Sequence, residues 1–479
     1  MNLSEFRKQA HLLVDWMTDY LENVETFPVK SQVEPRQIFH QLSPAPPFEG
    51  ESMETIFEDF QRVIVPGITH WQSPGFFAYF QANSSPPSIL AEMLTATLAA
   101  QCMIWDTSPA AAELEEMMIN WLRDMCGLPH SWTGAIQSTA SEATLCAMLS
   151  ARERITDFRI NESGFGPSDR IRIYCSSETH SSIEKGAKIA GFGRQNVVKI
   201  PVDLQLAMRP DALRKAIADD VAAGYQPGCV IASIGSTSTH AMDPIKEIGE
   251  ICESLGIWFH IDAAHAGTAM ILPEYRYLID GIEKADSYVF NPHKWMLTNF
   301  DCTAYFVKDK GTLIRTFEIL PEYLKTQHTS QTNNYRDWGI PLGRRFRALK
   351  LWFVIRSYGL AGLKEKVRND INNSQHIADV IQARPDFELF IPPPLNLVCF
   401  RFKPEGNWSE NQINEFNSQI VNQLNASGEI YITHTKIDGK YLIRLSIGQT
   451  NMTAAHVDRA WNLISTKAAE VLQSAHLSG

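Results

Sequence analysis

Short apolar runs alternate with helical stretches between residues 89 and 365, and this alternation constrains the fold more than any other sequence feature. The clearest runs are IRIYC at 171–175, VIASIG at 230–235, IWFHID at 257–262, SYVFN at 287–291 and AYFVK at 304–308. Strands that alternate with helices predict a mostly parallel sheet with helices on both faces. A ligand site is then expected where the strands end at their carboxyl side.

The two ends of the chain predict smaller parts. Residues 1–25 place apolar side chains at helical spacing, and Pro-rich and Gly-rich loops follow, so 1–88 predicts a helical arm that needs another surface to pack on. The apolar runs NLVCFRF and YLIRLSIG stand between helical stretches near the other end, which predicts a small α+β domain over 370–479. The large α/β domain is then expected over 89–369.

Composition and charge narrow the class of protein. Of the 479 residues, 44% are hydrophobic and 20% charged, which is typical of a folded globular chain. The net charge of −11 argues against a nucleic acid or an anionic membrane as partner. The eight cysteines form no C-x-x-C pair, so no metal site or redox dithiol is predicted. The charged N-terminal sequence does not resemble a signal peptide, and we expect a cytoplasmic protein that acts on a small molecule.

The segment NPHKW at 291–295 places Lys294 directly after an apolar strand. By itself, a lysine that extends from a strand end into solvent is an equally good interpretation. A desolvated lysine, however, has a lowered pKa and becomes a usable amine nucleophile toward a carbonyl group.

Asp262 ends a second apolar strand, in IWFHIDAAHAG at 257–267. Taken alone, it is better interpreted as a helix N-cap. One further helix and strand separate Asp262 from Lys294, so both side chains can converge on one crevice. A carboxylate there can keep a pyridine nitrogen protonated, which is what makes pyridoxal phosphate (PLP) an electron sink.

Two further segments are ambiguous when each is considered alone. A loop of small residues at 134–141 leads into a helix, where Thr139, Ala140 and Ser141 can offer N–H groups and hydroxyls to a phosphate. A simple Ser/Thr cap is commoner. His180, in SSETHSS, is first interpreted as an ordinary core or loop histidine.

In this order and spacing, these segments together resemble the PLP-dependent group II amino-acid decarboxylases, most closely the aromatic-L-amino-acid (DOPA) decarboxylases. The resemblance covers nearly the whole chain and includes THWQSPGFFAYF at 69–80, SPAAAELEEMMINWL at 108–122, THSSIEKG at 179–186 and IPLGRRFRALKLWFVIRSYG at 340–359. It implies a PLP-dependent carboxy-lyase with the aspartate-aminotransferase-like fold (fold type I) and a mostly parallel seven-stranded sheet. It also implies a homodimer, with the N-terminal arm packed on the partner and active sites built from two subunits.

The resemblance assigns roles to individual residues. Lys294 would carry the cofactor as a Schiff base, Asp262 would partner the pyridine nitrogen, and His180 would stack on the cofactor ring. The other cofactor-binding residues that it implies are Thr139, Ala140, Ser141, Thr237, Ala264, Asn291 and His293. Tyr335, in the polar stretch LKTQHTSQTNNYRDW at 324–338, matches the family's loop tyrosine, which protonates the α-carbon after carbon dioxide leaves. Such a loop fits a lid that excludes water.

Aromatic side chains predict the substrate side, although such residues also fill cores. The residues that would line the pocket, partly from the neighbouring subunit, are Trp71, Tyr79, Phe80, Met103 and Trp105. They fit an aromatic L-amino acid such as DOPA, tyrosine, tryptophan, phenylalanine or 5-hydroxytryptophan. The chain departs from the animal enzymes at Gln81, Ala82, Gln101, Met103 and Asp106, which leaves the preferred ring open.

Other functions explain fewer of these features. An aromatic aldehyde synthase is the nearest alternative, but such relatives often lack the loop tyrosine, so Tyr335 favours an amine product. A histidine or glutamate decarboxylase is more distant, because Gly343 matches aromatic decarboxylases better than animal-type histidine decarboxylases. The sheet pattern also permits a nicotinamide-dependent dehydrogenase, but no G-x-G-x-x-G follows a strand. A non-catalytic scaffold does not explain Lys294, Asp262 and His180 together.

Overall fold

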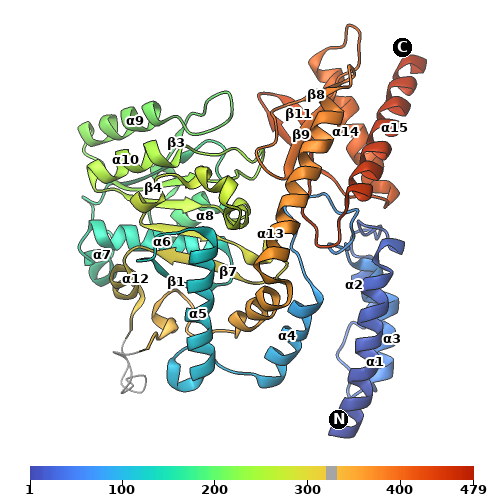
Figure 1. Ribbon diagram of the computed structural model, residues 1–479, viewed down its shortest axis with the longest axis horizontal. Coiled ribbons are helices and arrows are strands. Elements are labelled where there is room, and N and C mark those ends of the chain that lie inside the picture. Colours follow the sequence, from blue (N-terminus) through green and yellow to red (C-terminus); the bar gives the residue numbers. More distant parts are fainter. Residues whose placement is uncertain (320–331, 479) are drawn as a thin grey trace. The chain divides into compact units, whose positions relative to one another are not determined.

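The computed structural model describes residues 1–319 and 332–478, which form two compact units (Figure 1). The large unit is Ala82–Ile371, and the small unit combines Met1–Gln81 with the chain from Asn372 onward. The boundaries expected from the sequence, after residues 88 and 369, stand close to these divisions. The N-terminal and C-terminal segments nevertheless belong to one compact unit.

A seven-stranded sheet forms the centre of the large unit, in the order β1-β7-β6-β5-β4-β2-β3. The strands are β1 (Thr133–Gln137), β2 (Ile171–Ser176), β3 (Val197–Ile200), β4 (Gln226–Ser233), β5 (Trp258–Asp262), β6 (Ser287–Phe290) and β7 (Thr303–Val307). Only β7 is antiparallel to its neighbours, β1 and β6. The prediction of a mostly parallel seven-stranded sheet is confirmed. All five apolar runs are strands, whereas β1 and the edge strand β3 carry weaker apolar patterns.

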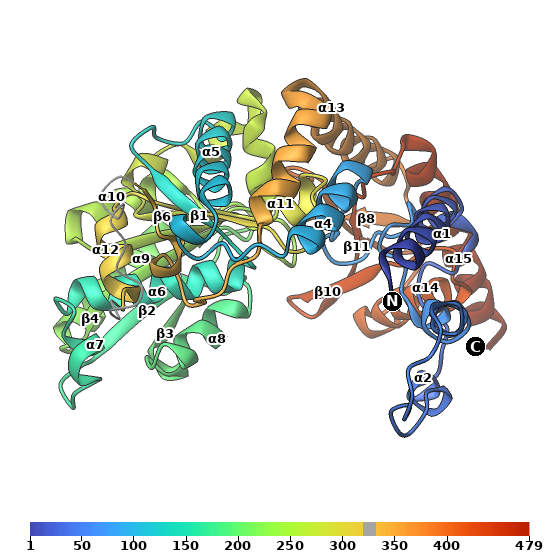
Figure 2. The same cartoon turned by 90° about the horizontal axis from the view of Figure 1, so that it is seen from below.

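Helices cover both faces of this sheet, as the two views show (Figures 1 and 2). The large unit's helices are α4 (Pro86–Leu98), α5 (Pro109–Cys126), α6 (Ala140–Ile155), α7 (Arg159–Ser163), α8 (Ser182–Ile189), α9 (Pro210–Ala222), α10 (Ile245–Leu255), α11 (Pro292–Trp295) and α12 (Lys310–Phe317). The strand order reverses direction after β3, so right-handed crossovers place α6 and α8 on one face and α9 and α10 on the other. Because both faces are covered, the central strands are apolar throughout.

The small unit contains a four-stranded antiparallel sheet in the order β10-β11-β9-β8. Its strands are β8 (Phe387–Leu389), β9 (Leu397–Phe402), β10 (Thr433–Ile437) and β11 (Lys440–Ser446), and its helices are α1 (Leu3–Glu22), α2 (Gln37–Gln41), α3 (Met53–Asp59), α14 (Glu410–Ser427) and α15 (Ala454–Ser478). The N-terminal segment joins this sheet region because the Phe77 N–H donates to the Tyr431 carbonyl and the Tyr431 N–H donates to the Gly75 carbonyl.

One long element, α13 (Arg347–Gln382), runs through the boundary between the two units. Gly359 has a φ of 65°, which glycine adopts without a Cβ clash, and this residue divides the element into two helical parts. None of the helices in the described ranges combines the length and apolarity needed to cross a bilayer.

Candidate active site

Strand register brings the predicted cofactor residues to one edge of the large sheet. Ser233 is paired with Asp262, and Asp262 with Val289, so β4, β5 and β6 end side by side. Gln137 is paired with Thr303 on β7, which also borders β6. Asp262 is the last residue of β5, and the residues that follow the strand ends include Thr139, Thr237, Ala264, Asn291 and Lys294. Their common position is the carboxyl edge, where parallel sheets bind ligands.

Lys294 lies in α11, a single turn that begins directly after β6. Its backbone is held at both ends, because its N–H donates to the Asn291 carbonyl at 2.9 Å and its own carbonyl accepts from the Asn83 side chain at 2.5 Å. Burial lowers the pKa of the Lys294 amine, and the Asp262 carboxylate opposes this shift. The amine is therefore easier to deprotonate than an exposed lysine.

Asp262 is the last residue of β5, and 8% of its surface is exposed. One carboxylate oxygen accepts the Ala264 N–H at 3.0 Å. Burial raises the pKa of Asp262, while Lys294, the Ala264 N–H and His180 oppose the shift. Lys294 and His180 are the two other residues that were predicted to contact the body of the cofactor.

His180 follows the carboxyl end of β2 and is exposed to solvent. Its Nδ1 accepts the Ser182 N–H at 3.1 Å, and the Ser182 hydroxyl lies 2.7 Å from the same atom. Desolvation of the ring nevertheless lowers the pKa of His180, and Asp262 opposes this. A neutral ring with a fixed orientation suits stacking on a flat ligand.

The start of α6 forms the anion-binding end of the site. Thr139 is the N-cap of this 16-residue helix, and its hydroxyl accepts the Glu142 N–H at 3.4 Å. The first N–H groups of a helix have no partner within the helix, and they attract an anion. Glu142 also accepts the Ser138 N–H at 3.1 Å, which orders the turn that precedes the helix.

Thr303 joins this turn to the lysine segment, a role that the sequence analysis missed. Its hydroxyl lies 2.8 Å from Asn291 Oδ1 and 3.1 Å from the Ser138 carbonyl.

His293 lies beside Lys294, and its Nδ1 accepts the Cys302 N–H at 3.0 Å. Burial lowers the pKa of His293 to about 3, and the Lys294 charge adds to the effect. His293 is therefore neutral, with its Nε2–H left as a donor.

These groups fit PLP by their chemistry. The site offers an amine of lowered pKa for the carbonyl, a buried carboxylate for the ring nitrogen, an exposed neutral imidazole for the ring face and a helix N-terminus for the phosphate. The described residues thus supply a complementary group for each part of the cofactor.

Tyr335 does not lie where a lid tyrosine was expected. It begins a 3-10 turn (Tyr335–Asp337), is 1% exposed and belongs to an apolar cluster with Ala140 and Trp338. Burial raises the pKa of Tyr335 well above its usual value. This is the environment of a core tyrosine, and the role of Tyr335 as the proton donor of a closing loop stays a prediction. Residues 324–331 of the predicted lid lie outside the described residues.

The predicted substrate residues are divided between the two units. In the small unit, the rings of Trp71 and Tyr79 stack with centroids 5.9 Å apart, and the Tyr79 hydroxyl lies 3.1 Å from that of Tyr431. Tyr79 has a φ of 53° and is 49% exposed, so a strained backbone presents this ring to solvent. Phe80 lies beneath the Arg444 guanidinium, 5.6 Å from the ring centroid. Tyr431, which contacts Tyr79, was not among the residues predicted from the sequence.

In the large unit, Met103 and Trp105 lie on a loop that is bound to the segment after the undescribed residues. The Arg336 N–H donates to the Met103 carbonyl at 2.9 Å, and the Trp105 N–H donates to the Asn334 side chain at 3.1 Å. The Trp105 indole N–H donates to Glu113 at 2.9 Å. This loop therefore has fixed anchors.

Gln81, one of the departures from the animal enzymes, has a structural position. It is fully buried, and its amide donates to the Phe76 carbonyl at 3.2 Å and the Ser446 carbonyl at 2.6 Å. The Ser446 hydroxyl donates to Gln81 Oε1 at 3.0 Å. The side chain thus fixes the segment that carries Tyr79 and Phe80.

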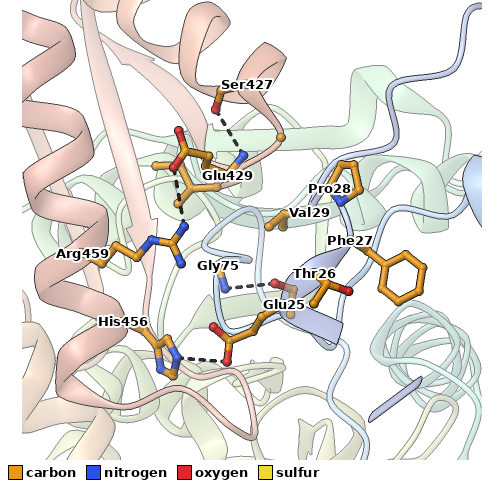
Figure 3. Close-up of a pocket in the computed structure, with 13 residues that line it drawn as sticks. Glu25, Thr26, Phe27, Pro28, Val29, Gly75, Ser427, Glu429, His456 and Arg459 are labelled. Atoms are coloured by element: carbon orange, nitrogen blue, oxygen red, sulfur yellow. Dashed lines mark hydrogen bonds and ion pairs between the residues drawn. The ribbon is translucent and has the colours of Figure 1, made fainter. Parts of the chain in front are cut away.

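A cavity of about 250 Å³ in the small unit is separate from these residues. Figure 3 shows Glu25 facing His456, 3.4 Å away, and Glu429 facing Arg459, 3.5 Å away. Its charged groups pair with one another, and none of the predicted catalytic residues lines it. It is not part of the candidate site.

Comparison with known proteins agrees with this geometry. The model of the pyridoxal-dependent decarboxylase conserved domain matches residues 35–403. A tyrosine decarboxylase from Narcissus pseudonarcissus is 40% identical over 98% of this chain and 95% of its own length. A phenylacetaldehyde synthase from Arabidopsis thaliana is 40% identical over 98% and 97%. The Oryza sativa TDC solved with PLP and tryptamine is 33% identical, with a TM-score of 0.95 over 98% of this chain and 99% of that one.

The structure places a lysine and a carboxylate at the carboxyl edge of the sheet, and the chain is similar to these enzymes over its full length. The chain therefore belongs to the family of pyridoxal-dependent decarboxylases.

Proposed function

We propose that this protein decarboxylates an aromatic L-amino acid to the corresponding amine, with Lys294 as the residue that binds PLP covalently. The observation that carries the proposal is the position of half-buried Lys294 and buried Asp262 at the carboxyl edge of the sheet, where each affects the pKa of the other. One relative is named a tyrosine decarboxylase and another was solved with tryptamine, which supports an aromatic substrate. The Arabidopsis phenylacetaldehyde synthase, equally similar, supports an aldehyde product as the alternative.

Each predicted site residue would contact a different part of the cofactor or substrate. Bound PLP supplies an electron sink for the pair of electrons that remains when carbon dioxide leaves. Asp262 would hold the proton on the ring nitrogen, and its low hydration strengthens that hydrogen bond. His180 would cover one ring face, and the start of α6 with His293 and Asn291 would hold the phosphate. Lys294 would take up and return the proton of the incoming amine.

A substrate panel tests the proposed specificity. We expect amine release from at least one of tyrosine, DOPA, tryptophan, 5-hydroxytryptophan and phenylalanine, with kcat/KM for histidine and glutamate at least about 100-fold lower. The reason is that the predicted substrate residues are mostly aromatic, and aromatic rings favour an apolar ring over a charged side chain. Amine, aldehyde and oxygen uptake are measured together. Preference for glutamate or histidine would contradict the aromatic assignment, and stoichiometric aldehyde would select the alternative product.

Replacement of Lys294 tests the cofactor assignment. We expect Lys294→Ala to lose the adduct that borohydride reduces, and to lose turnover by several orders of magnitude, because it removes the primary amine. Lys294→Arg is the matched control, since it keeps a cation opposite Asp262 but cannot form the linkage. Mass spectrometry of the reduced wild type should place the adduct on Lys294. An adduct that persists in both variants would reject this assignment.

Tyr335→Phe tests whether Tyr335 donates the proton to the α-carbon. Because the ring is buried in the core, we expect the variant to keep amine as its product and to lose about 1 kcal/mol of unfolding free energy with the hydroxyl. Product ratio, oxygen uptake and thermal unfolding are the measurements. A shift toward aldehyde and peroxide would show instead that Tyr335 reaches the substrate after a rearrangement.

The proposal includes a homodimer. Within the small unit α1 exposes Leu3, Phe6 and Leu12, and within the large unit α4 exposes Leu90, Leu94 and Leu98. Apolar rows of this kind favour burial against a second protein surface. We expect sedimentation to give a dimer at assay concentration, and Leu94→Glu to shift it toward monomer. A fully active monomeric wild type would contradict this part of the proposal.

A cytoplasmic location also belongs to the proposal. All eight cysteines are free and buried in the structure. The absence of disulfides among them supports a reducing compartment.

A further inference from the structure

A fully buried carboxyl group that the proposed chemistry does not use lies in α13. Asp370 is 0% exposed, and its two oxygens have different partners. The Trp295 indole N–H donates to Oδ2 at 2.9 Å, and the Lys366 ammonium donates to Oδ1 at 2.8 Å. Burial raises the pKa of Asp370 to about 6, and both partners oppose the shift. Burying a carboxyl group costs free energy, so the contacts that Asp370 makes are the place to look for its role.

Trp295 connects Asp370 to both halves of the catalytic pair. It is the residue after Lys294 and the last residue of α11. Its ring, also fully buried, stacks on His265 with centroids 5.0 Å apart and an interplanar angle of 4°. His265 follows Asp262 by three residues. One indole therefore contacts the segment of Asp262 and belongs to the segment of Lys294.

The hydrogen bond adds an orientation that packing alone does not provide. Apolar contacts hold a ring in place but tolerate rotation and small shifts, whereas an N–H donor points at its acceptor. With the N–H directed at Asp370 and the face against His265, the indole plane has one orientation. Because Trp295 and Lys294 share the single turn of α11, that orientation also sets the direction in which the Lys294 side chain leaves the backbone.

We propose that Asp370 is a positioning residue, which acts through the Trp295 indole to hold Lys294 at the correct distance and angle from Asp262. It contacts neither cofactor nor substrate. The proposal rests on the proposed function only in taking Lys294 as the lysine that binds PLP. It assigns a role to the second helical part of α13, where Asp370 lies 75 residues from Trp295 along the chain.

Four variants separate the hydrogen bond from the buried charge. Asp370→Asn keeps an oxygen acceptor for the indole at nearly the same volume, whereas Asp370→Leu removes the acceptor and keeps a side chain that branches at the same atom. Trp295→Phe removes the donor and keeps a ring against His265. Lys366→Met is the matched control, since it removes the ion pair and leaves the indole hydrogen bond.

The principal readout is the rate at which apoprotein captures added PLP on Lys294, trapped with borohydride and located by mass spectrometry. Thermal unfolding of each apoprotein is measured in parallel, and kcat and KM of the holoenzyme follow. We expect Asp370→Leu and Trp295→Phe each to lower the capture rate and kcat about tenfold, the scale of one buried hydrogen bond, with KM little changed. Asp370→Asn and Lys366→Met should remain within about threefold of wild type.

The double variant Asp370→Leu/Trp295→Phe decides whether the two residues act as one unit. We expect it to be no slower than either single variant, because both remove the same hydrogen bond. Multiplied effects, or a normal Trp295→Phe beside a slow Asp370→Leu, would overturn the proposal. So would a Lys366→Met as slow as Asp370→Leu, or an Asp370→Leu that unfolds at lower temperature but captures PLP at the wild-type rate. If wild type itself forms no adduct on Lys294, the proposed function fails instead.

Discussion

The mutual attraction of a half-buried lysine and a buried carboxylate determines how this site works. Burial moves the pKa of Lys294 down and that of Asp262 up, and the attraction between them opposes both shifts. Each shift favours the neutral form of its group, and the attraction between the two charges limits that shift. A pair on the surface would remain fully charged and hydrated, with little tendency to react with a carbonyl or a pyridine nitrogen.

The sheet supplies that environment because of its topology. Parallel strands β4, β5 and β6 end together, and the chain turns away from each end in a short loop. Helices on both faces exclude water from the strands, while the loops at the carboxyl edge remain free to carry polar groups. The Thr303 hydroxyl shows how closely these loops are linked, since it lies within hydrogen-bonding distance of both the turn before α6 and Asn291 beside Lys294. The site is therefore as rigid as the sheet edge that carries it.

The sequence predicts the features that follow from local patterns. Asp262 and Lys294 each follow a run of apolar residues, and the register of β5 and β6 places them at one edge as expected. Long-range partners have no such pattern: Thr303, Asp370 and Tyr431 are ordinary residues until the fold brings them to Asn291, Trp295 and Tyr79. Tyr335 shows the opposite error, because its polar neighbours in sequence suggest an exposed loop while its ring packs against Trp338 in the core.

Tyr79 combines a strained, fixed backbone with a ring that is partly exposed to solvent. A left-handed backbone costs a tyrosine about 1–2 kcal/mol, and such strain persists only where the surroundings impose it. Here the fully buried Gln81 amide fixes the segment from within, while Trp71 stacks on the ring and Tyr431 meets its hydroxyl. The outer side of the ring nevertheless stays open to solvent. A ring that is already ordered in the folded protein loses little conformational entropy when it binds a flat partner. It can therefore discriminate between partners without rearranging. Under the proposed function, the reaction type depends on Lys294 and Asp262 at the sheet edge, and the part that Tyr79 would take in the choice of aromatic ring rests on a backbone that Gln81 fixes from within its own unit.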